Sequence, residues 1–64
     1  MLSKEDYNNY LAQMKQLEIK MVIVYKDCAD RVKDEHIKEV CSGISSQERK
    51  HVSIVEELEK LFNI

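Results

Sequence analysis

Proline and tryptophan are absent from this sequence, and glycine occurs only once. Without proline, nothing in the chain forces a long helix to end. No apolar run reaches about 18 residues, so no segment is expected to span a membrane. The residues from Met1 to Asp6 have no apolar core and do not resemble a secretory signal. The formal net charge of −2, without a lysine or arginine cluster, excludes general attraction to nucleic acid.

The 64 residues are 44% apolar and 34% charged, which is typical of a soluble, amphipathic helical protein. We therefore expect an all-α fold with one domain over residues 1–64. A chain this short buries little apolar surface and is only marginally stable alone. Oligomerisation or a bound metal is the expected supplement.

Cys28 and Cys41 are the two cysteines, and they do not form a C-x-x-C pair. The simpler interpretation is two buried thiols in a reducing cytoplasm, which is the expected location of the protein. A second interpretation stays open, because both residues lie near the expected turn. There they can form a reversible disulfide, and the protein would then be a thiol redox sensor rather than a metalloprotein.

A first helix is expected over about residues 4–32, because one apolar stripe follows the period of an α-helix. Ser3 is a good N-cap for it. Glu18 stands near the centre of the stripe, whereas Ile19 and Ile23 point elsewhere and indicate a further packing partner. The stripe consists of Tyr7, Tyr10, Leu11, Met14, Leu17, Met21, Tyr25, Cys28 and Val32.

A second helix is expected over about residues 35–62. Glu48 and His51 fall inside its apolar stripe, one helical turn apart. An alternative stays open, in which the helix breaks near Gly43 and Ser45-x-x-Glu48 is the capping box of a third helix. The stripe consists of Ile37, Val40, Cys41, Ile44, Val55, Leu58, Leu61 and Phe62.

The turn is expected near residue 33, with Asp34 as the N-cap of the second helix. A connection this short favours antiparallel neighbours, so residues equally far from the turn lie at the same height. Glu18 lies 15 residues before residue 33 and Glu48 lies 15 residues after it. The two carboxylates should therefore face each other, with His51 one turn away.

Two carboxylates at one height in an apolar seam repel each other, and burying them unpaired costs several kcal/mol. A divalent cation removes this difficulty, so Glu18, Glu48 and His51 are predicted metal ligands. One hairpin supplies three ligands and leaves most of each stripe exposed. A homodimer closes a four-helix bundle and brings four carboxylates together, which balances two divalent ions. Imidazole with carboxylate suits iron, manganese or zinc.

Simpler interpretations stay open for the same residues. Glu18 can instead pair with Lys15 or Lys20, and His51 can be a core or interface histidine without a metal. In that case the chain is a non-enzymatic dimerisation or interaction module, and the three polar side chains form a buried network that sets the register of the helices.

Several residues also carry a resemblance to a known family. Leu17-Glu18 is followed by Tyr25 and Ala29, and Ser46-Gln47-Glu48-Arg49-Lys50-His51 is followed by Leu58. This pattern resembles the ferritin-like di-iron carboxylate proteins of the rubrerythrin type. The step of 30 residues from Glu18 to Glu48 is also similar to the helical hairpin of encapsulated ferritins, which dimerises to complete its iron site.

The resemblance implies two iron ions per dimer, with Glu48 bridging them and with Glu18 and His51 as terminal ligands. It implies oxidation of Fe(II) by dioxygen or hydrogen peroxide. Tyr25, two turns from Glu18 on the same face, would donate a hydrogen bond to a ligand or lie on an electron path. The chain departs from full-length rubrerythrins, which carry all four helices in one chain and often add a four-cysteine domain. It also lacks the encapsulation tail of the encapsulated ferritins.

Overall fold

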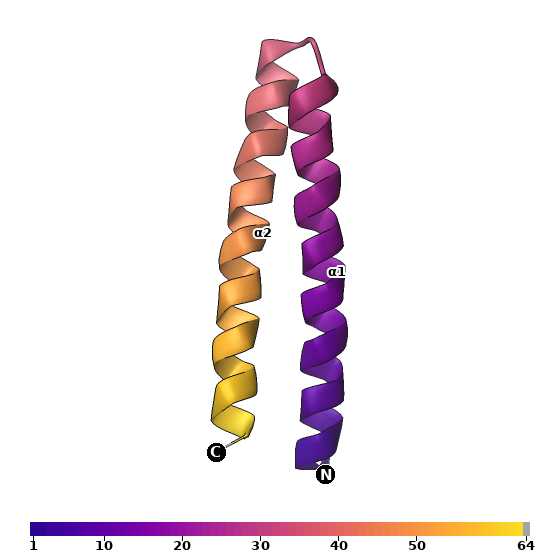
Figure 1. Cartoon of the computed structure of the whole chain (residues 1–64), viewed down its shortest axis with the longest axis vertical. Helices are drawn as coiled ribbons and strands as arrows, with labels where there is room; N and C mark the ends of the chain where they lie inside the picture. Colours follow the sequence, from indigo (N-terminus) through magenta and orange to yellow (C-terminus); the bar gives the residue numbers. More distant parts are fainter. Residues whose placement is uncertain (64) are drawn as a thin grey trace.

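The computed structural model describes residues 1–63, which form two antiparallel helices joined by a short connection. Helix α1 spans Lys4–Arg31 and helix α2 spans Glu35–Phe62. The two helices run side by side for their full length, and both termini lie at the end opposite the turn (Figure 1). The expected all-α hairpin is thus confirmed, and the helix ends lie within one residue of those expected.

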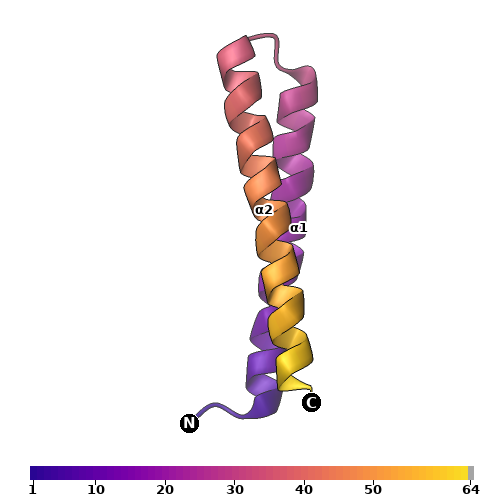
Figure 2. The ribbon, with the colours of Figure 1, turned by 90° about the vertical axis from the view of Figure 1, so that its left-hand side faces the viewer.

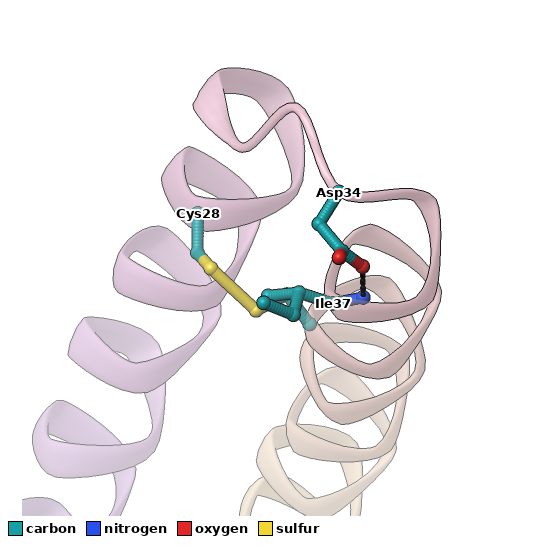
Figure 3. Close-up of a disulfide and its surroundings, with 4 residues drawn as sticks. Cys28, Asp34 and Ile37 are labelled. Atoms are coloured by element: carbon teal, nitrogen blue, oxygen red, sulfur yellow. Dashed lines mark hydrogen bonds between the residues drawn. A yellow bond between two sulfur atoms is a disulfide. The ribbon is translucent and has the colours of Figure 1, made fainter.

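Each helix begins at a polar cap that the sequence indicated. The Oγ atom of Ser3 accepts a hydrogen bond of 3.1 Å from the backbone N–H of Asp6, whose carboxylate accepts one of 3.0 Å from the N–H of Ser3. This reciprocal capping box satisfies donors that the first turn leaves free. Asp34 caps α2 by accepting a hydrogen bond of 3.0 Å from the N–H of Ile37 (Figure 3). The caps therefore fix where both helices start.

Helix α2 passes through residue 43 without a break. The alternative with a third helix starting at Ser45 is therefore wrong. A Cβ atom added at Gly43 would meet no atom within 4 Å, so this glycine lies on an open surface of the helix. A mid-helix glycine costs only about 1 kcal/mol relative to alanine, which a stripe that continues in phase readily offsets.

The seam between the helices is held at several heights. Near the termini, the rings of Tyr7 and Phe62 stack with centroids 5.0 Å apart and so join the two helices at this end. Between this end and the middle of the hairpin, Leu11 and Val55 are buried. Closer to the turn, the hydroxyl of Ser45 donates a hydrogen bond of 3.2 Å to the carbonyl oxygen of Val22. These contacts set the relative height of the two helices.

A disulfide joins Cys28 of α1 to Cys41 of α2 next to the turn (Figure 3). The two Cα atoms lie 6.1 Å apart. The expectation of two free thiols is thus wrong, because the antiparallel register brings the two stripes together at this height. Disulfides persist mainly in oxidising environments, so the expectation of a reducing cytoplasm loses the support it drew from these cysteines.

The core of a single hairpin is thin. Viewed from the side of α2, which lies in front of α1, the molecule is one layer of two helices (Figure 2). Among residues 1–63, the buried apolar residues are Leu11, Cys41 and Val55, and the hairpin exposes 5193 Å². A compact monomer of this mass exposes about 4,300 Å². The fold therefore leaves much of its apolar surface uncovered.

Eight of the exposed apolar residues lie on one side of the hairpin, which we name the open face, whereas others such as Ile19 and Ile23 lie on another side of α1. Its members follow the helical period beside the seam and remain at least 37% exposed. The groove between the helices on the opposite side is polar and includes Lys26, Asp30, Ser42, Ser46 and Arg49. The open face consists of Tyr10, Met14, Leu17 and Met21 from α1 and of Val40, Ile54, Leu58 and Leu61 from α2.

Candidate metal centre

Glu18 of α1 meets Glu48 and His51 of α2 halfway along the seam. One potential ligand atom from each of these three residues lies within 4.8 Å of the others. The connection between the helices is centred on residue 33, as expected, so the two carboxylates reach the same height. The structure therefore brings together all three residues that the sequence predicts as ligands.

The local fold determines which way the three side chains point. Glu48 and His51 are one helical turn apart, and residues at this spacing are neighbours on a helix surface. Glu18 lies two turns along α1 from the buried Leu11, and Glu48 lies two turns along α2 from the buried Val55. Since two turns return almost to the same direction, both carboxylates share the face that packs in the seam.

The burial of the three side chains is unequal. The side chains of Glu18 and Glu48 are 17% and 13% exposed, whereas that of His51 is 52% exposed. The Nδ1 atom of His51 lies 3.8 Å from Oε1 of Glu18 and 3.7 Å from Oε2 of Glu48. These distances are too long for hydrogen bonds and describe an ion pair only when the imidazole is protonated. The three side chains therefore lie close together, but no hydrogen bond joins them.

Glu18 carries the clearest sign that the cluster lacks a partner. Its Oε2 atom is buried and forms no hydrogen bond within residues 1–63. A buried carboxylate oxygen without a partner is costly, because the group has lost its hydration without replacement. Two carboxylates and one imidazole form a donor set suited to iron, manganese or zinc. The arrangement thus fits a divalent transition-metal ion, which would bind the unpaired oxygen.

The simpler partner considered for Glu18 is engaged elsewhere. The Nζ atom of Lys15 lies 2.7 Å from Oε1 of Glu59, and both side chains are partly buried. The hydrogen bond to the Glu59 carboxylate raises the pKa of Lys15 above its usual value of 10.5, which keeps the ammonium charged. Lys15 is therefore not the partner of Glu18, and within residues 1–63 Lys20, the other lysine considered, forms no ion pair with Glu18 either.

An apolar groove adjoins the cluster on the open face. It is lined by Met14, Glu18 and His51 together with Ile54, Val55 and Leu58. His51 thus stands at the edge of the seam, exposed on the same side as the uncovered apolar residues. Met14 and Met21, expected to pack in a core, are 49% and 37% exposed in the single hairpin. Neither methionine is therefore packed in a core within the single hairpin.

Tyr25, the residue predicted to assist the ligands, is half-buried in α1. It lies seven residues after Glu18 and three before Cys28, so these residues share one side of the helix. Its predicted role stays a prediction. His36, for which the sequence suggested no role, is exposed near the turn.

The chain matches no protein-family model, no curated protein and no solved structure. The resemblance to rubrerythrin-type proteins thus rests on the residues alone, and two helices are too common an arrangement to establish it. Neither helix within residues 1–63 combines the length and apolar character that crossing a membrane requires.

Proposed function

We propose that this chain binds a divalent transition-metal ion through Glu18, Glu48 and His51. The observation that carries the proposal is the buried, unpaired Oε2 atom of Glu18 beside a second carboxylate and an imidazole. A cation satisfies this oxygen and removes the repulsion between the two carboxylates. Within one chain the three ligands leave coordination positions open, as in catalytic rather than structural metal sites.

We propose further that the working unit is a homodimer with two iron ions, in a ferritin-like four-helix bundle. The open face supports this, because a second hairpin packed against it would cover the exposed apolar residues and the exposed side of His51. Two chains supply two copies of each ligand. Their four carboxylates carry a charge of −4, which two divalent ions balance. Manganese or zinc are the other ions that suit these ligands.

At such a site Fe(II) would be oxidised by dioxygen or hydrogen peroxide, which is the chemistry that the resemblance implies. The chain itself brings the three ligands together, with the two carboxylates at one height and His51 one turn away. By the resemblance, Glu48 would bridge the two irons, and Glu18 and His51 would be terminal ligands. The apolar residues of the open face would exclude water from the site once two hairpins meet. Tyr25 lies on the same side of α1 as Glu18, and by the resemblance it would donate a hydrogen bond to a ligand.

Metal-dependent melting tests the proposal. The thermal midpoint of the protein should rise when Fe(II) or Mn(II) is added without oxygen, since a ligand that binds only the folded state stabilises it. Glu48→Ala should abolish the rise. Glu39→Ala, which removes an exposed carboxylate from the same helix, should retain it. A midpoint that metal leaves unmoved in the unaltered protein would show that the three residues do not form a metal site.

One observation favours a second candidate function. The Nδ1 atom of His51 lies within 4 Å of both carboxylates, so a protonated imidazole would pair with both at once. The three side chains would then be a polar network that sets the register of a non-enzymatic dimerisation module. The same melting experiment separates the two functions, because such a module gains nothing from metal.

A further inference from the structure

The disulfide between Cys28 and Cys41 is a redox-active group that the proposed function does not use. It joins the same two helices that carry the metal ligands, on the turn side of the site. Cys41 lies seven residues before Glu48 in α2, which is two helical turns or about 10 Å along the axis. A two-electron couple therefore lies close to a cluster suited to redox metals.

The space between the disulfide and the cluster is occupied by packed protein. In α2, the buried Ser45 lies one turn from Cys41 and one turn from Glu48. Its hydroxyl donates a hydrogen bond of 3.2 Å to the carbonyl oxygen of Val22, which ties the two helices together at this height. In α1, the half-buried Tyr25 lies between Cys28 and Glu18. The buried Ser45 and the half-buried Tyr25 thus lie between the disulfide and the carboxylates along the two helices.

We propose that Cys28 and Cys41 are the internal electron donor of the metal site, and this inference rests on the proposed function. In the reduced state, the two thiols lose two protons and two electrons and form the S–S bond. The two electrons convert two ferric ions at the ligand cluster into two ferrous ions. Atoms and electrons balance with one cysteine pair for each pair of irons. A dimer would therefore carry one pair more than a single reduction needs.

The cycle closes through thiol–disulfide exchange with an external dithiol. Such a reductant attacks one sulfur, forms a mixed disulfide and leaves by closing its own disulfide, which returns Cys28 and Cys41 to thiols. Cys28 is half-buried whereas Cys41 is only 7% exposed, so Cys28 is the more accessible of the two residues to an attacking thiolate. The proposed second substrate of this protein is therefore a dithiol that reduces the disulfide.

The test starts from fully reduced protein, freed of reductant and kept without oxygen. Two equivalents of ferric citrate per dimer are added, and two quantities are followed: ferrous ion, by a coloured chelator, and free thiols, by a thiol reagent. We expect one thiol to disappear for each ferrous ion formed. The mass of half of the chains should fall by two hydrogen atoms. Glu48→Gln, with both cysteines intact, should slow the loss of thiols at least tenfold, and Glu39→Gln should leave it unchanged.

Three results would overturn the inference. If the protein binds iron at the expected stoichiometry but the thiols persist, the disulfide is only a structural crosslink and the metal-binding proposal stands. If thiols disappear equally fast in Glu48→Gln, the oxidation does not pass through the site. If no iron binds, both proposals fail together.

The double variant Cys28→Ser/Cys41→Ser should bind iron without reducing it, and circular dichroism checks that it folds. Since the thiol count is made on the unaltered chain, the test does not depend on this variant.

Discussion

The Nδ1 atom of His51 lies 3.8 Å from the Oε1 atom of Glu18, although the two residues belong to different helices. They meet because Glu18 and Glu48 are equally far from the centre of the turn and because His51 follows Glu48 by one helical turn. Nothing within residues 1–63 bonds to the buried Oε2 atom of Glu18. The packing of the two helices therefore brings these three side chains together, although no hydrogen bond between them stabilises the arrangement.

Replacing Glu18 by glutamine should stabilise the metal-free protein. The change removes one of two facing negative charges, so the free energy of unfolding should rise by about 1 kcal/mol. For a domain of this size that is about 4–8 °C in the thermal midpoint. The variant should at the same time lose its stabilisation by Mn(II). Glu39→Gln, at an exposed position, serves as the control. A midpoint that falls without metal would show that the carboxylate already has a favourable partner.

The open face provides a matched pair of variants for dimerisation. Leu17 lies on the open face and is 63% exposed, whereas Ile23 lies on another side of α1 and is 62% exposed. Leu17→Lys should weaken dimerisation at least tenfold, or about 1.4 kcal/mol, because the interface would bury the new charge. Ile23→Lys should leave it unchanged. Analytical ultracentrifugation without metal measures both, and equal effects would rule out the open face as the dimer interface.

Reduction of the disulfide should destabilise the hairpin. Cys28 and Cys41 are 13 residues apart in the sequence, and closing a loop of this length contributes about 3 kcal/mol through the unfolded state. Urea denaturation with and without a reductant measures the difference. The double variant Cys28→Ser/Cys41→Ser should respond to urea identically in both conditions. A reductant that leaves the unaltered protein equally stable would mean that the crosslink does not constrain the unfolded chain.

Gly43→Ala should stabilise the protein by up to about 1 kcal/mol. The helix is continuous at this position and an added Cβ atom meets nothing within 4 Å, so alanine gains helix propensity without a clash. Thermal denaturation measures the change. A loss of stability would indicate that a partner molecule approaches the backbone closely at this residue.

The ion pair between Lys15 and Glu59 should affect how the free energy of unfolding falls at alkaline pH. Because the hydrogen bond to Glu59 raises the pKa of Lys15, folding favours the charged ammonium. Its contribution is complete below the ordinary value of 10.5 and is lost as the pH rises through the higher pKa of the folded state. Lys15→Met should therefore lose less stability than the unaltered protein over this interval. Urea midpoints along the pH scale measure it, with Lys20→Met as the control, and parallel curves for Lys15→Met and the unaltered protein would contradict this assignment.

The hairpin and its polar cluster could be predicted because they depend on periodicity. The stripes locate both helices, Ser3 and Asp34 mark their starts, and equal distances from the turn place Glu18 opposite Glu48. The state of Cys28 and Cys41 could not be predicted, since two cysteines on facing stripes are compatible with thiols or with a disulfide.

The ion pair between Lys15 and Glu59 could not be predicted from the spacing of the apolar residues either. Both side chains are long and flexible, so their heads meet at a point that the direction of the Cα–Cβ bond does not determine. Ser45 shows a related limit. As a serine near the only glycine it favoured a helix start, yet its side chain is buried and bonds across the seam to the backbone of Val22.

An anaerobic titration with Fe(II), with the number of chains per particle taken from light scattering on the same sample, tests the central claim most directly. The account predicts particles of two chains that bind one iron per chain, and it predicts that Glu48→Gln dimers bind none. A well-folded dimer that binds no iron would contradict the metal site. Glu18, Glu48 and His51 would then be a polar network inside an interaction module.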